Sequence, residues 1–171
     1  MSTLVVETGG ALSNANSYAT EAEGTTFFSE RPSAFIAEWS NATSLNREAA
    51  LIWATRLIDE QVQWFGAKAT QAQALRWPRY GVLDRDGYQY NSNVVPPFLK
   101  SATCEQALAL LREDRTADAL YGFSQIDVGP IGLAIDKLNY QPVLSDAVRA
   151  ILAPYGTFAS DVLTCLRVAR A

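Results

Sequence analysis

Histidine is absent from this chain of 171 residues, and only two cysteines and one methionine occur in it. Without histidine, the chain lacks the commonest general base and the commonest metal ligand of proteins. Cys104 and Cys165 do not have metal-ligand spacing, and we interpret both as buried thiols. The chain also has no Gly-x-Ser-x-Gly elbow and no glycine-rich phosphate loop. We therefore expect no metal, no cofactor and no enzymatic activity.

A basic surplus is also missing, since the formal net charge is −4. Proteins that bind nucleic acid through phosphates usually carry a basic surplus or a basic stripe. The charge balance argues against this class, although a local patch would suffice. No apolar run approaches the roughly 20 residues that span a bilayer, and the first residues include no basic region. We expect neither a membrane segment nor a secretory signal, and the length fits a single domain over residues 1–171.

Five segments carry helical patterns, over about residues 21–29, 33–40, 44–60, 98–115 and 146–153. Their starts offer capping groups, namely the capping box Thr20-x-x-Glu23 and the N-cap candidates Ser33, Ser44 and Ser145. The third helix has the clearest apolar stripe, formed by Ala50, Trp53, Ala54, Leu57 and Ile58.

The fourth helical segment is apolar on two faces. One face has Leu99, Ala102 and Leu110, and the other has Cys104, Ala107, Leu108 and Leu111. A helix that is apolar on two sides is usually buried on both. The pattern therefore predicts either a central helix or a helix at a subunit contact.

Three segments read as extended, over about residues 1–13, 124–136 and 157–171. In the second, apolar residues alternate on both sides of Gly129-Pro130, which predicts a β-ribbon with Ile126, Val128, Ile131 and Leu133. In the third, Leu166 and Val168 are apolar residues beyond the last helix. We expect a mainly α fold, a compact bundle of four or five helices with a small β-ribbon and extended N- and C-terminal arms. Both apolar segments are candidates to contact neighbouring subunits.

Residues 74–87, which we call the signature loop, contain an unusual number of large side chains for a connection. Its candidate partner-binding residues are Trp77, Arg79, Tyr80 and Asp84. Such a Trp, Tyr and Arg combination can pack back on the protein's own helices, anchor a protein interface, or stack nucleobases. If DNA is not bound, we expect the arginines of the loop to face protein carboxylates.

Acidic pairs have simple interpretations. Asp84-x-Asp86-Gly87 resembles the start of a calcium loop, but Val95 occupies the position where the closing glutamate belongs, so we interpret the segment as a turn. Asp59 and Glu60 are predicted to be solvated, because no basic or nucleophilic partner stands at a known spacing.

The signature loop also carries a family resemblance. Trp77-Pro78-Arg79-x-Gly81-Val82-x-Asp84-x-Asp86-Gly87, followed by Val95-Pro96, resembles phage and prophage neck proteins that carry the label of DnaT-like single-stranded-DNA-binding proteins. Further matching segments are Asn16-Ser17-Tyr18-Ala19-Thr20, Ala49-Ala50-Leu51-Ile52-x-Ala54-Thr55-x-Leu57-Ile58-Asp59, Val128-Gly129-Pro130-Ile131 and Leu166-Arg167-Val168-Ala169-Arg170. The segments occur in order over nearly the whole chain.

The resemblance implies a structural head–tail connector, or neck adaptor. Such a protein would be made in the host cytoplasm and reside in the virion neck, as a ring of twelve copies on the portal. Its partners would be the portal protein, a tail or second neck protein, and its own copies, with DNA passing through the ring without specific binding. The alternative, which the family label suggests, is a single-stranded-DNA-binding protein.

Overall fold

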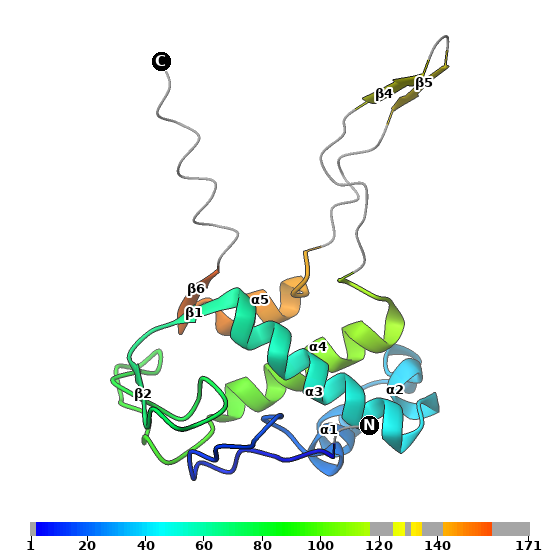
Figure 1. Cartoon of the computed structure of the whole chain (residues 1–171). Helices are drawn as coiled ribbons and strands as arrows, with labels where there is room; N and C mark the ends of the chain where they lie inside the picture. Colours follow the sequence, from blue (N-terminus) through cyan, green and yellow to red (C-terminus); the bar gives the residue numbers. More distant parts are fainter. Residues whose placement is uncertain (1–2, 117–124, 129–130, 135–141, 159–171) are drawn as a thin grey trace, which may run out of the picture.

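The computed structural model describes residues 3–116, 125–128, 131–134 and 142–158. Its five α-helices confirm the mainly α prediction. They are α1 (Glu21–Ser29), α2 (Ala37–Asn41), α3 (Ser44–Gln61), α4 (Pro97–Arg112) and α5 (Asp146–Leu152), with a 3-10 turn, η1 (Ser33–Phe35), before α2. Short strands complete the fold (Figure 1), namely β1 (Val62–Trp64), β2 (Ala67–Lys68), β3 (Arg79–Tyr80), β4 (Gln125–Val128), β5 (Ile131–Ala134) and β6 (Gly156–Phe158).

Side-chain caps fix the starts of three helices. The capping box of α1 is confirmed, because the Thr20 hydroxyl accepts from Glu23 N–H and the Glu23 carboxylate accepts from Thr20 N–H. Ser145 caps α5 as predicted. The predicted cap of α3 is wrong by one residue, since the hydroxyl of Thr43 accepts from Asn46 N–H and Ser44 is already helical.

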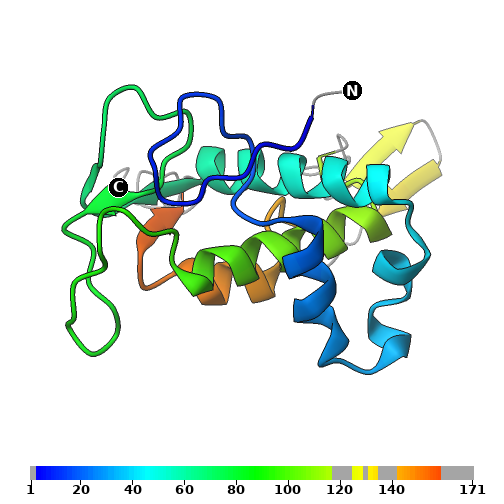
Figure 2. The ribbon, with the colours of Figure 1, turned by 90° about the horizontal axis from the view of Figure 1, so that it is seen from below.

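Helix α4 is the central helix of the body. Leu99 and Ala102 belong to one core cluster with α5 and the C-terminal half of α3, and Cys104, Ala107 and Leu108 belong to a second cluster with α1 and α2. The two predicted apolar faces of this helix are therefore both buried within the subunit. Helices α3 and α4 lie side by side (Figure 2), and in Figure 1 α5 lies on the upper side of this pair and α1 on the lower side.

One member of the predicted α3 stripe is wrong. Trp53 is 36% exposed, whereas Leu51, Ala54 and Ile58 are fully buried. The buried face of α3 is centred on those residues, so Trp53 falls at its edge, where the guanidinium of Arg56 stacks on the indole at 5.2 Å.

Three antiparallel strand pairs accompany the helices. β1 pairs with β6, in the register Val62↔Phe158, and β2 pairs with β3. β4 pairs with β5, with Ile126 opposite Leu133, which confirms the predicted β-ribbon in its backbone. Thr157 and Phe158, the first residues of the predicted C-terminal arm, belong to β6 and pack on the body, since Phe158 is only 6% exposed.

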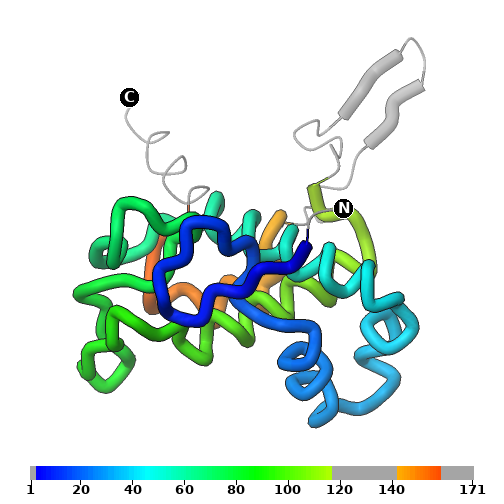
Figure 3. Tube along the Cα trace, turned by 60° about the horizontal axis from the view of Figure 1, so that its bottom comes forward, coloured from blue at the N-terminus to red at the C-terminus, as the bar shows by residue number. Residues whose placement is uncertain are grey.

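The N-terminal segment lies against the body (Figure 3). The fully buried carboxylate of Glu7 accepts hydrogen bonds from the N–H groups of Gly9, Ala11 and Leu12, at 2.7–3.1 Å. In turn, Leu12 accepts a hydrogen bond from the N–H of Ala74, at 2.9 Å. The N-terminal segment is thereby joined to the signature loop.

Candidate functional site

Trp77, the largest side chain of the signature loop, is completely buried. Its ring makes edge-on contacts with Trp64, Tyr90 and Phe98, at centroid distances of 5.8, 6.2 and 5.6 Å. The peptide bond between Trp77 and Pro78 is cis. Of the three alternatives for this tryptophan, packing on the protein's own core is the one that the subunit adopts, and its ring offers no face to a nucleobase.

Arg79 is also turned inward and is 7% exposed. Its guanidinium donates to the carbonyl oxygens of Phe65 and Gly66 at 2.8 Å, of Arg76 at 3.0 Å and of Trp64 at 3.4 Å. The expectation of a carboxylate partner is therefore wrong for this residue. A planar fork of donors suits several carbonyls at once, and these bonds hold the connection between β1 and β2 against the signature loop.

Asp59 and Tyr18 form a second junction with the loop. The Tyr18 hydroxyl donates to the Asp59 carboxylate at 2.7 Å and accepts from the N–H of Trp77 at 3.2 Å. The N–H of Arg76 also donates to Asp59, at 2.9 Å. The prediction that Asp59 is solvated is therefore wrong, because long-range packing brings it the donors that its sequence neighbours lack. Glu60, by contrast, is exposed.

Burial controls the protonation of this pair. It raises the pKa of Asp59 to about 6, although the hydrogen bonds from Arg76 N–H and the Tyr18 hydroxyl oppose the shift. Burial, followed by the charge of Asp59, raises the pKa of Tyr18 above its ordinary value. Tyr18 thus stays a hydrogen-bond donor, and Asp59 changes charge at about pH 6.

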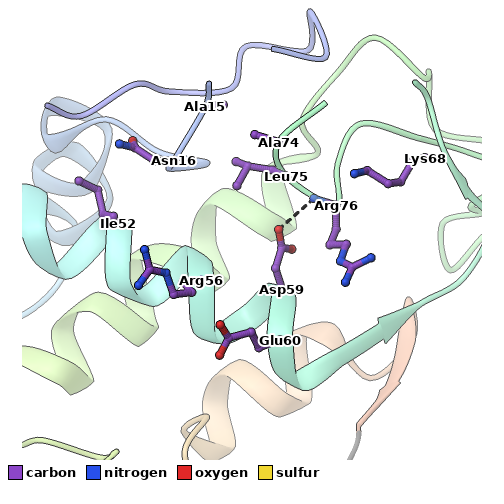
Figure 4. Close-up of a pocket in the computed structure, with 10 residues that line it drawn as sticks. All are labelled: Ala15, Asn16, Ile52, Arg56, Asp59, Glu60, Lys68, Ala74, Leu75 and Arg76. Carbon is purple, nitrogen blue, oxygen red and sulfur yellow. Dashed lines mark hydrogen bonds between the residues drawn. The ribbon is translucent and has the colours of Figure 1, made fainter. Parts of the chain in front are cut away.

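A groove opens beside this junction, between α3 and the signature loop (Figure 4). We call it the basic groove, because Arg56, Lys68 and Arg76 line it. Two carboxylates, Asp59 and Glu60, line it as well. The Lys68 ammonium donates to the carbonyl oxygen of Gln73, at 2.9 Å. With three cations and two carboxylates, the groove suits a ligand with both anionic groups and hydrogen-bond donors.

Most other cations of the described residues lie beside carboxylates. The five ion pairs found there are Arg31–Glu105, Arg47–Glu21, Lys100–Glu23, Arg112–Glu38 and Arg115–Glu113. Surface pairs of this kind contribute little to stability, but they neutralise the surface locally. Arg56, Lys68 and Arg76 of the basic groove belong to none of these five ion pairs.

The tip of the signature loop faces outward. Tyr80 and Leu83 are 51% and 54% exposed, and Tyr88, the residue that follows the loop, is 74% exposed. The Asp84 carboxylate accepts from the N–H groups of Asp86 at 2.9 Å and Tyr88 at 2.8 Å, which confirms the predicted turn. Tyr80 and Asp84 are thus the candidate residues that the structure places within reach of a partner.

Comparison with known protein families covers nearly the whole chain. Residues 2–171 match the model of the family described as "Putative DnaT-like ssDNA binding protein". The chain belongs to this family. No curated protein and no solved structure matches it.

Membership of this DnaT-like family confirms the label that the resemblance suggested, while the neck adaptor stays a prediction. No cluster of side chains that could hold a metal occurs among the described residues, and none of their helices has the length and apolarity to cross a membrane. The candidate residues Ile126, Val128, Ile131 and Leu133 are described in their backbone alone, and Leu166 and Val168 lie outside the described residues.

Sequence reasoning missed the groove and the Tyr18–Asp59 junction. Arg56, Lys68 and Arg76 are separated along the chain, so no local charge run marks the groove. The junction did leave a signal, because Tyr18 and Asp59 each belong to a segment of the family resemblance. Two polar residues inside separate family segments could have been paired as contact candidates.

Proposed function

We propose that this protein is a structural head–tail adaptor of a bacteriophage neck. In this proposal it has no catalytic activity and forms a ring on the portal that continues the DNA channel toward the tail. The family resemblance supplies the portal, the tail-side partner, the twelve copies and the location in the virion neck.

The observation that carries the proposal is the inward orientation of the signature loop. The residues best suited to hold a nucleobase, Trp77 and Arg79, are buried and bonded within the subunit. The loop therefore serves to shape the subunit, while its exposed tip, with Tyr80 and Leu83, offers apolar surface of the kind found at protein interfaces. A net charge of −4, repeated around a ring, would also leave a passing duplex free to slide.

Co-expression with the portal protein of the same phage tests the proposal. We expect a co-purifying complex that contains a ring of subunits in electron micrographs. Leu83→Asp should weaken the complex without loss of the helical circular dichroism signal, because the side chain is 54% exposed. Ala49→Asp, at an exposed position of α3, is the matched control. If the wild-type chain binds neither the portal protein nor its own copies at any ratio of the two proteins, the adaptor function is overturned.

Single-stranded-DNA binding is the second candidate, favoured by the family description and by the basic groove. Trp53, 36% exposed and stacked on Arg56, offers an aromatic ring near this groove. If the three cations of the groove contact phosphates, a plot of the logarithm of the DNA-binding constant against the logarithm of the salt concentration should have a slope of about −2.

Fluorescence anisotropy with labelled oligonucleotides separates the two candidates. For an adaptor we expect no binding tighter than the weak non-specific range, on the order of 10⁻⁴ M at physiological salt. Micromolar binding (on the order of 10⁻⁶ M) that Arg56→Gln and Arg76→Gln abolish, and that the exposed control Arg85→Gln leaves intact, would favour the DNA-binding function. The measurement belongs on the portal-bound ring as well as the free protein, because a ring can create a site between subunits.

A further inference from the structure

A second groove, mainly apolar, lies between α1 and α4. Ala22, Thr26 and Phe27 line it from α1, and Ser101 and Cys104 line it from α4. Two carboxylates border it. Glu23 forms an ion pair with Lys100, at 2.6 Å. Glu30 is exposed, and no ion pair is found for it among the described residues. The groove therefore suits an apolar segment that carries positive charge.

The sequence of this chain contains such a segment. Residues 159–171, which follow β6, include the apolar residues Val162, Leu163, Leu166 and Val168. They also include Arg167 and Arg170 against a single acidic residue, Asp161. The apolar side chains match the lining of the α1–α4 groove, and the two arginines complement Glu30 in charge.

The start of this segment and the α1–α4 groove lie on different sides of the body. β6 pairs with β1, and Phe158 packs in the core cluster that contains α5. Helix α1 packs in the other cluster, so α4 stands between the two. In Figure 1, α5 and β6 lie on the upper side of the helical body and α1 lies on the lower side. Two unlike complementary surfaces on one subunit are what a head-to-tail ring contact requires.

We propose that the α1–α4 groove is the acceptor site for the C-terminal segment of the adjacent copy in the ring. The apolar residues of segment 159–171 occupy the groove, and Arg167 or Arg170 pairs with Glu30 of the accepting copy. This inference rests on the ring of the proposed function. It adds a defined donor segment and a defined acceptor for the contact between subunits.

A reciprocal charge exchange in the full-length protein tests the contact whatever its register. Glu30→Arg should weaken subunit association about tenfold, since like charges then meet at the interface. Adding Arg167→Glu and Arg170→Glu to the same chain should restore association. Glu48→Arg, on α3 and outside the groove, is the matched control and should associate like the wild type. Light scattering after size-exclusion chromatography measures association, and circular dichroism verifies the fold.

Disulfide cross-linking identifies which copy provides the segment. In a Cys104→Ala background, used because Cys104 also lines the groove one helical turn away, Ser101→Cys places a thiol in the α1–α4 groove, and the native Cys165 lies in segment 159–171. Mild oxidation should give a ladder of covalent multimers for this variant and none for Ala49→Cys. A cross-linked product of monomer size would place the segment in the groove of its own chain and overturn the inference. If Glu30→Arg associates like the wild type, or if the reciprocal charge exchange does not restore association, the inference is overturned while the ring of the proposed function stands. A wild-type chain that forms no ring, with or without the portal, would overturn both the ring and the inference.

Discussion

Replacing Trp77 by alanine is the most direct test of the role of the signature loop. The side chain has no exposed surface and touches three aromatic rings at centroid distances between 5.6 and 6.2 Å. Truncation of a buried tryptophan to alanine costs roughly 3–5 kcal/mol of unfolding free energy, because the lost contacts leave a cavity. Domains have a total stability of about 5–15 kcal/mol. Trp77→Ala should therefore remove from about a fifth of the stability of the subunit to nearly all of it.

Urea unfolding followed by circular dichroism measures this loss. A cost of 3–5 kcal/mol also lowers the melting temperature by roughly 6–20 °C for a domain of this size. Trp77→Phe, which keeps an aromatic ring in the site, should cost less than the alanine variant. Tyr80→Ala is the matched control, because Tyr80 is 51% exposed in the same loop and should change stability by about 0.5 kcal/mol or less. Equal, small effects of Trp77→Ala and Tyr80→Ala would refute the structural role of the loop.

Two further predictions concern the junctions behind the loop. Burial raises the pKa of Asp59 from 3.8 to about 6. The contribution of the protonated carboxyl group to stability is therefore complete below the unfolded pKa and is lost as the pH rises through 6. At 1.36 kcal/mol per pKa unit, that contribution is at most about 3 kcal/mol. The stability of the wild type relative to Asp59→Asn should therefore fall by up to that amount between about pH 4 and pH 7, and parallel stability curves from urea unfolding would contradict the buried junction. Arg79→Lys should cost about 2 kcal/mol in the same assay, because an ammonium cannot bond all four carbonyls that the guanidinium holds; a stability within error of the wild type would contradict the bonding.

The sequence predicted the helices well, because the residues that start or end a helix lie within a few positions of one another along the chain. A hydroxyl and a carboxylate three residues apart identify the start of α1, and proline ends α5, whatever the rest of the chain does. The two apolar faces of α4 also follow from its own sequence. The choice between a central helix and a subunit contact does not follow from that sequence. It depends on which elements cover each face, here α5 and the C-terminal half of α3 on one face and α1 and α2 on the other.

The features that sequence reasoning missed depend on contacts between distant segments. Asp59 looked solvated because its donors, Tyr18 and the N–H of Arg76, are 41 and 17 positions away along the chain. The sequence predicted a carboxylate partner for Arg79. In the fold, however, the guanidinium bonds four carbonyl groups, three of which belong to Trp64, Phe65 and Gly66, at least 13 positions away along the chain. For Trp77, core packing, a protein interface and nucleobase stacking all favour the same residue types, so only the burial of the side chain in the fold decides between these three roles.

Three of the segments that carry the family resemblance meet at these junctions in the fold. Tyr18 belongs to the first segment, Thr55 and Asp59 to the second, and Trp77 to the signature loop. In the fold they meet at one place, where the N–H of Tyr18 bonds Thr55 at 3.3 Å and its hydroxyl bonds both Asp59 and Trp77. These family segments therefore mark a structural junction in this chain. Binding of single-stranded DNA by this chain would then depend on residues outside that junction, such as Arg56 and Lys68 in the basic groove.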